Sequence, residues 1–134
     1  MSNNYVYYQP NELDKHDIYG DCTIRALSKV FNCSWKEAFK KQIPYCLKYQ
    51  VTSAFDCPAK QAKVILKELG FEYHSIKVPK GSKRPTVESF AREHTTGRYI
   101  VNVARHIVAV VDGKYYDTWD SGDKCLYGFY ELVS

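Results

Sequence analysis

The 134-residue sequence predicts an α+β protein, in which N-terminal helices pack on a C-terminal antiparallel β-sheet. Apolar residues recur at helical spacing in several segments between residues 22 and 70. After residue 98 the pattern changes to short runs rich in valine, isoleucine and tyrosine, which is typical of strands. The dipeptide Asp112-Gly113 separates two of these runs and indicates a tight hairpin.

Three helices are expected in the first half and a short one later. The first covers residues 22–31, with Asp21 as its N-cap. A second begins at Trp35, and a third spans residues 58–70, with a proline at its start and a glycine at its stop. Residues 86–94 form the short helix, and residues 44–57 show no clear pattern.

The expected strands lie mostly in the last forty residues. Besides a short strand near the N-terminus and one that follows the third helix, four strands are expected in succession. In chain order the expected strands are residues 5–8, 71–78, 98–103, 106–113, 114–120 and 125–133. With no repeat or linker between these elements, we expect one domain over residues 1–134.

The composition excludes several classes of protein. Apolar residues make up 45% and charged residues 25%, which is typical of a globular domain. The net charge of +4 is too small to favour a nucleic-acid binder, and the basic stretch of residues 77–85 is expected to be a solvated loop. The N-terminus has no signal-peptide pattern and no apolar run is long enough for a membrane span, so we expect a cytoplasmic protein without membrane partners.

The cysteines argue against a metal or a disulfide framework. Five cysteines are an odd number, and none forms a CxxC pair or finger spacing with a histidine. The acidic residues 117–124 lack the ligand spacing of a calcium loop. We therefore expect neither a metal nor another cofactor.

Cys22 is the strongest candidate for a catalytic residue. It opens the first helix, where the helix dipole and the free N–H groups favour a thiolate over a thiol. A cysteine at a helix start is more often a packing residue, so this position alone does not establish chemistry. Cys57, which precedes Pro58, is the nearest rival.

His106 and Asp117 are the candidates for a base and for the group that orients it. If Asp112-Gly113 is a two-residue turn, His106 falls opposite Trp119 and diagonal to Asp117 on one face of the hairpin. Asp120 is an alternative orienting group only if the strand ends before it, because it otherwise points to the other face. A carboxylate on Nδ1 of His106 leaves Nε2 for the thiol of Cys22, as in a catalytic triad.

Two motifs carry a family resemblance. The stretch "GDCTIRALSKV" and, about eighty residues later, "RHIVAVVDGKYYDTWDSG" resemble the papain-like cysteine peptidases. The likeness is greatest to bacteriocin-leader-processing peptidases and to small cysteine-peptidase-like proteins of phages and prophages. It implies Cys22 as nucleophile, His106 as base and Asp117 as orienter. These peptidases usually carry a glutamine shortly before the cysteine as oxyanion donor; here His16 is the candidate donor.

The sequence leaves two functions open. One is a thiol-dependent acyl-transfer hydrolase, such as a peptidase or isopeptidase, with a peptide or protein as substrate; deamidation or transamidation would use the same groups. The other is an inactive or weak version of the fold that binds a protein, as a phage-encoded protein that occupies a host protein would. The absence of the upstream glutamine favours this second function.

Overall fold

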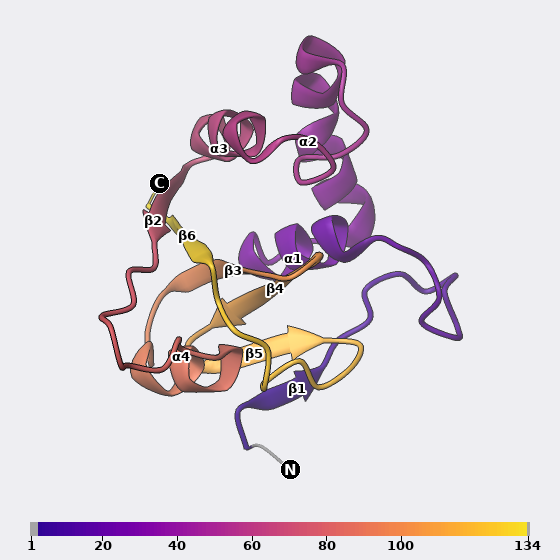
Figure 1. The fold of residues 1–134 in the computed structure, drawn as a ribbon. Coiled ribbons are helices and arrows are strands. Elements are labelled where there is room, and N and C mark those ends of the chain that lie inside the picture. Colours follow the sequence, from indigo (N-terminus) through magenta and orange to yellow (C-terminus); the bar gives the residue numbers. More distant parts are fainter. Residues whose placement is uncertain (1–2, 134) are drawn as a thin grey trace.

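The structure is a computed structural model that describes residues 3–133, and within this range it is an α+β fold with four helices and one six-stranded sheet (Figure 1). The helices are α1 (Cys22–Val30), α2 (Trp35–Tyr49), α3 (Ala59–Glu68) and α4 (Val87–Glu93). The strands are β1 (Tyr5–Tyr7), β2 (Phe71–Ser75), β3 (Arg98–Val103), β4 (His106–Val111), β5 (Lys114–Asp117) and β6 (Gly128–Leu132).

The sheet is mixed, so the expectation of an antiparallel sheet was wrong, and the strands expected at residues 5–8 and 71–78 join the C-terminal ones in it. Its strand order is β1-β5-β4-β3-β6-β2, and β1 runs parallel to β5 at one edge. The first strand is held there by side chains as well as by the ladder. Asn4 donates from Nδ2 to the Gly113 carbonyl at 2.8 Å, and the rings of Tyr5 and Tyr115 lie 5.6 Å apart. A three-residue strand carries no sign of this distant partner in its own sequence.

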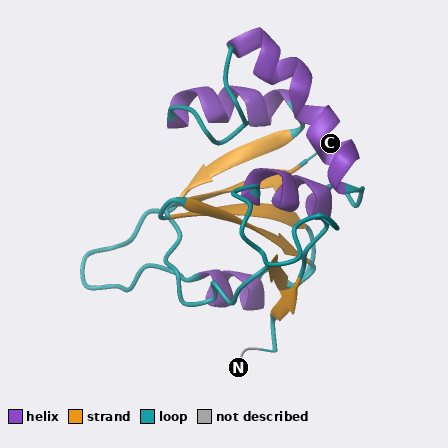
Figure 2. Cartoon of the chain, turned by 90° about the vertical axis from the view of Figure 1, so that its right-hand side faces the viewer, coloured by secondary structure: helices purple, strands orange, loops and turns teal. Residues whose placement is uncertain are grey.

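Helices cover both faces of the sheet (Figures 1 and 2). One buried cluster joins α1 to the sheet through residues such as Leu27, Ile100 and Ala109, and α3 adds to the same side. The other cluster lies beneath α4, around Phe90 and Val110. Because side chains alternate along β3 and β4, neighbouring residues of one strand enter opposite clusters. The predicted packing of the early helices on the sheet holds for one face, whereas α4 occupies the other.

The ends of the helices differ in part from the predicted ones. Asp21 precedes α1, but its side chain makes no capping hydrogen bond to the helix. Ser34 does cap α2, because its side chain accepts from the Glu37 N–H at 3.1 Å. Helix α2 continues through Pro44 to Tyr49 and so takes up part of the stretch that had no clear pattern. A proline normally breaks a helix, so the sequence pattern does not predict this extension.

The β4–β5 hairpin has the register that its turn predicts. Val111 pairs with Lys114 and Ala109 with Tyr116. Asp112 and Gly113 both have positive φ, 49° and 83°, as a two-residue type I′ turn requires. Strand β5 ends at Asp117, three residues earlier than expected. This register sets the start of β4 beside the end of β5, where the candidate site lies.

No helix in residues 3–133 combines the length and the apolar character that crossing a bilayer requires.

Candidate active site

Cys22 and His106 line one cleft of about 500 Å³ on the face of the sheet that carries α1 and α3. Residues of β3, β4 and β6, among them Asn102, Ile107 and Tyr130, line it from the sheet. The start of α1 contributes Cys22, and the remaining wall comes from residues 52–57 and the first turns of α3. Segments about eighty residues apart in sequence therefore meet at this cleft.

The thiol of Cys22 lies at the start of β4. It is hydrogen-bonded to the imidazole of His106 and to the backbone N–H of Ile107. Nε2 of His106 in turn lies 2.6 Å from Oδ2 of Asp117. The fold thus brings the three residues singled out in the sequence into one continuous chain of hydrogen bonds.

The electrostatics of this chain favour charge separation. Burial raises the pKa of the Cys22 thiol, but the hydrogen bond and charge of His106, together with the Ile107 N–H, outweigh burial and lower it. Burial likewise lowers the pKa of His106, but its hydrogen bonds with Asp117 and Cys22 prevail and raise it to about 9. The opposite shifts favour a thiolate beside an imidazolium, which is the reactive form of a nucleophilic cysteine.

The two ring nitrogens of His106 have roles opposite to those predicted. Asp117 binds Nε2, so Nδ1 is the nitrogen left for the Cys22 thiol. The reason is the position of the sulfur beside the backbone N–H of Ile107, the next residue along. Nδ1 is the ring nitrogen nearer the main chain, whereas Nε2 points outward to the neighbouring strand.

Four groups hold the carboxylate of Asp117, whose side chain is only 2% exposed. Besides His106, the hydroxyl of Ser121 donates at 3.0 Å and the backbone N–H of Thr118 at 2.8 Å. Nη2 of Arg25, on the helix that carries Cys22, lies 3.7 Å from Oδ1. These four partners fix the buried carboxylate in place.

Arg25 joins the site to a second, partly buried carboxylate. Its Nη1 forms an ion pair with Asp21, the residue just before α1. Asp21 also accepts from Nε1 of Trp35 at 2.8 Å and from Nδ2 of Asn11 at 3.3 Å. Asp21 therefore serves as the counter-ion of Arg25 rather than as a helix cap, and Arg25 bridges two carboxylates.

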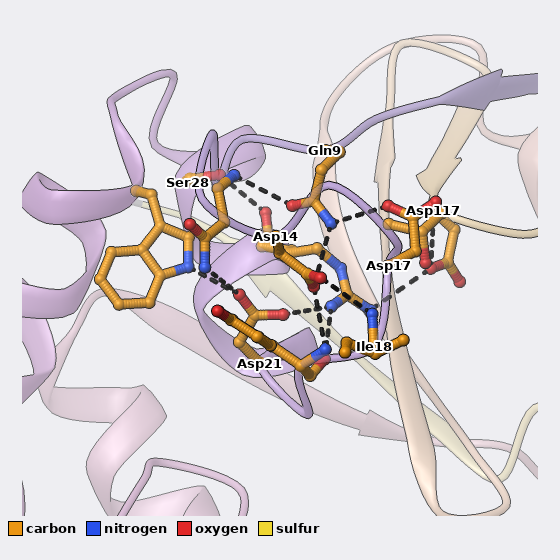
Figure 3. Close-up of polar contacts among 12 residues, drawn as sticks. Gln9, Asp14, Asp17, Ile18, Asp21, Ser28 and Asp117 are labelled. Carbon is orange, nitrogen blue, oxygen red and sulfur yellow. Dashed lines mark hydrogen bonds and ion pairs between the residues drawn. The ribbon is translucent and has the colours of Figure 1, made fainter.

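The buried carboxylate of Asp14 organises the loop before α1, as Figure 3 shows. Asp14 accepts from the N–H groups of Ile18 and Tyr19, both at 2.9 Å, and its side chain is buried. Gln9 donates to Asp17 at 3.0 Å from the other side of the loop. The segment that leads into Cys22 is thus fixed by its own hydrogen bonds.

Two of the predicted site residues do not join the triad. Asp120 accepts from the hydroxyl of Tyr115 and from the Gly122 N–H, so it orients the loop after β5 instead of His106. His16 is exposed and does not line the cleft, so nothing in the geometry supports it as an oxyanion donor. It was a candidate because it lies six residues before Cys22, where the family usually has a glutamine nearby, but the loop around Asp14 leaves its side chain in solvent.

Trp119 covers the imidazole. Its ring stacks on His106 with the centroids 5.1 Å apart and the planes 30° from parallel. This contact matches the cross-strand position predicted from the turn. The indole remains 43% exposed, so it lies as a partial cover between His106 and solvent.

The second cysteine of the cleft provides a contrast. Cys57 lines the same cavity, but burial and the nearby Asp56 carboxylate raise the pKa of its thiol. Its sulfur donates to the Ala54 carbonyl at 3.5 Å. It has no imidazole partner of the kind that Cys22 has. Of the two candidates in the sequence, only Cys22 has surroundings that favour a thiolate.

Sequence reasoning missed Arg25, Ser121 and Asn102. An arginine within an apolar helical pattern is a usable signal, because a buried guanidinium needs carboxylates nearby. Asn102 interrupts an otherwise apolar strand, and asparagine is uncommon in strands. Ser121 gave no signal, since serine is ordinary in a loop.

Within the part of the chain that the structure describes, no three His, Cys, Asp or Glu side chains are grouped to hold a metal ion. Comparisons of the chain with protein-family models, with curated proteins and with solved structures find no match.

Proposed function

We propose that the protein is a papain-like cysteine hydrolase that cleaves a peptide or isopeptide bond through a thioester. The observation that carries this proposal is the chain from Cys22 through His106 to Asp117, with the pKa values of the thiol and the imidazole shifted in opposite directions. Packing alone does not explain a buried ion pair of this kind, because desolvation opposes it.

The proposed mechanism has two steps. The Cys22 thiolate attacks the carbonyl carbon, and the C–N bond breaks as Nδ1–H of His106 protonates the departing amine. Water then attacks the thioester, His106 takes its proton, and the C–S bond breaks to restore the thiolate. Asp117 keeps the ring in position and stabilises the imidazolium. The N–H of Cys22 at the start of α1 is the proposed oxyanion donor.

The test compares cysteines that share one molecule. Iodoacetamide should label Cys22 at neutral pH much faster than Cys57, which lines the same cleft but has a raised thiol pKa. Cys125, the exposed cysteine, controls for access. His106→Ala should slow the labelling of Cys22 and leave Cys125 unchanged. Peptide mapping by mass spectrometry after timed labelling gives each rate.

The hydrolase proposal also predicts turnover. Cleavage of a denatured protein substrate should be lost in Cys22→Ala and in His106→Ala, with both variants folded by circular dichroism. If all five thiols react slowly, or if cleavage persists in Cys22→Ala, the proposal is wrong.

A second candidate is a protein-binding module that keeps this fold without turnover. The observation that favours it is the fixed loop before α1, which exposes Leu13 by 80% and Ile18 by 74%. Apolar side chains held in solvent by an ordered loop suit contact with a partner protein. Fast labelling of Cys22 together with turnover favours the hydrolase; slow labelling favours the binding module.

A further inference from the structure

The cleft contains a polar group that the triad does not use. Asn102 lies on β3, pairs with Ile107 on β4 and lines the cleft together with Cys22. In residues 3–133 its side-chain amide has no hydrogen-bond partner, although it is half-buried. An amide that is partly removed from water without a protein partner is available to a ligand.

Asn102 has one cross-strand neighbour on each side. On one side stands Ile107, and on the other Gly128 of β6, where the phenol of Tyr73 occupies the space that a Cβ would take. The preceding residue on the same face, Ile100, is fully buried in the core. Asn102 is therefore the point at which the apolar core face opens into the cleft, and its amide lies on the cleft floor.

The wall opposite the triad carries both apolar and polar side chains. Phe55 and Ala62 are apolar, whereas Thr52 and Ser53 carry hydroxyl groups. The charged residues of the cleft outside the triad are Asp56 and Arg105, one of each sign and both exposed at the rim. The floor thus offers no charge to pair with a charged side chain, and its hydrogen-bonding groups are the amide of Asn102 and the hydroxyl of Tyr130.

The position of Asn102 relates it to the scissile bond. The Cys22 sulfur is hydrogen-bonded to the N–H of Ile107, and adjacent strands lie about 5 Å apart. A peptide residue spans about 3.3 Å, so a group at Asn102 belongs one or two residues from the attacked carbonyl. Trp119 and Asp117 contact His106, and neither lines the cleft.

Resting on the proposed hydrolase function, we propose that Asn102 selects substrates with a neutral, hydrogen-bonding side chain, such as Asn, Gln, Ser or Thr. This side chain belongs to the acyl part of the substrate, one or two residues before the cleaved bond. Its amide or hydroxyl pairs with the Asn102 amide, while the apolar side chains of the wall contact its methylene or methyl groups. A site built to pair a polar group rejects an isostere that lacks it, because its own amide then stays unpaired.

The test uses covalent probes, so it does not depend on knowing a natural substrate. Four acetyl-dipeptidyl chloromethyl ketones carry either Asn or its isostere Leu, at the first or the second residue before the ketone, with Gly at the other position. Their rates of alkylation of Cys22 are measured in wild type, Asn102→Leu and Asn102→Ala. Each rate is divided by the rate of the same variant with iodoacetamide, which has no side chain to select.

At one of the two positions the wild type should react at least about tenfold faster with the Asn probe than with the Leu probe. Asn102→Leu should remove or reverse this preference, and Asn102→Ala should remove it without filling the space. The inference is overturned if wild type prefers Leu at both positions, or if the preference survives in both variants. Slow reaction of Cys22 with iodoacetamide itself overturns the proposed function and the inference with it, so the two failures are distinct.

Discussion

Nη2 of Arg25 lies 3.7 Å from Oδ1 of Asp117, so the helix that carries the candidate nucleophile also carries a cation facing the triad carboxylate. The same guanidinium pairs with Asp21 one turn earlier. Burial raises the pKa of the Cys22 thiol, whereas His106 and the Ile107 N–H lower it. The charge of Arg25 lowers it further, by a smaller amount. Folding of α1 and assembly of the site are coupled through this one side chain.

Replacing Arg25 by methionine should both destabilise the fold and weaken the nucleophile. The buried carboxylate of Asp117 and the partly buried one of Asp21 lose their counter-ion, which costs about 3–5 kcal/mol of unfolding free energy. The midpoint of the pH dependence of Cys22 alkylation should move to higher pH, since a nearby positive charge is gone. Urea denaturation measures the first effect and iodoacetamide labelling across pH the second.

The double variant Asp21→Asn, Arg25→Met separates the two roles. Removing the unpaired carboxylate should recover part of the lost stability, because fewer buried charges remain uncompensated. The thiol should keep its raised midpoint, since the guanidinium is still missing. If labelling returns to the wild-type midpoint along with stability, Arg25 has only a structural role.

The activity should depend on pH as a bell, because the reactive form needs both a thiolate and an imidazolium. Activity rises as Cys22 ionises, below the ordinary thiol pKa of 9.0, and falls as His106 loses its proton at about pH 9. Asp117→Asn removes the negative charge that raises the pKa of His106 and leaves only a neutral acceptor for its Nε2–H, so the basic limb should move to lower pH. The pH profile of kcat/KM measures both limbs, and the maximum should fall by about 10²- to 10⁴-fold in the variant. A basic limb that stays at pH 9 in Asp117→Asn would contradict the assignment of Asp117.

Ser121→Ala should make the carboxylate of Asp117 less fixed in position, because one of its hydrogen-bond donors is removed. The hydroxyl of Ser121 is fully buried and donates to Oδ2, the oxygen that also binds His106. Loss of a hydrogen bond to a charged group costs about 1.5–3 kcal/mol of unfolding free energy, and kcat should fall with KM little changed. Thr118→Ser is the matched control, because Thr118 donates to Asp117 through its backbone N–H and should behave as wild type. Equal effects of the two substitutions would contradict the proposed role of the Ser121 hydroxyl.

Gln42→Leu should make residues 52–57, the wall of the cleft opposite Cys22, less ordered. Gln42 is buried on α2 and accepts from the Ala54 N–H at 3.0 Å, which ties residues 52–57 to the helix. Without this acceptor, a buried N–H is unpaired, at a cost of about 1–3 kcal/mol, and KM for a peptide substrate should rise more than kcat falls.

The contrast is Gln61→Met on α3, where the side-chain Nε2 is buried without a hydrogen-bond partner among the described residues. Removing that amide should be neutral or stabilising, since no bond is lost. Thermal unfolding compares the two variants. The role of Gln42 in positioning the wall is excluded if Gln42→Leu is as stable as wild type and its KM is unchanged.

Local patterns determined most of the elements and the hairpin. Helical periodicity located α1 and α3, and Asp112-Gly113 fixed the register that sets His106 near Asp117, because a two-residue turn leaves one way to pair its strands. The position of Cys22 at the start of α1 follows from the same kind of local signal. These relationships span a few residues, so the sequence by itself specifies them.

Only the tertiary structure decided how distant segments meet. The parallel pairing of β1 with β5, the continuation of α2 through Pro44 and the side of His106 that faces the thiol depend on packing between elements remote in the chain. The same holds for the buried pairing of Arg25 with two carboxylates. A side chain's partner is set by which surfaces are buried against one another, and that choice is made by the whole fold rather than by neighbouring residues.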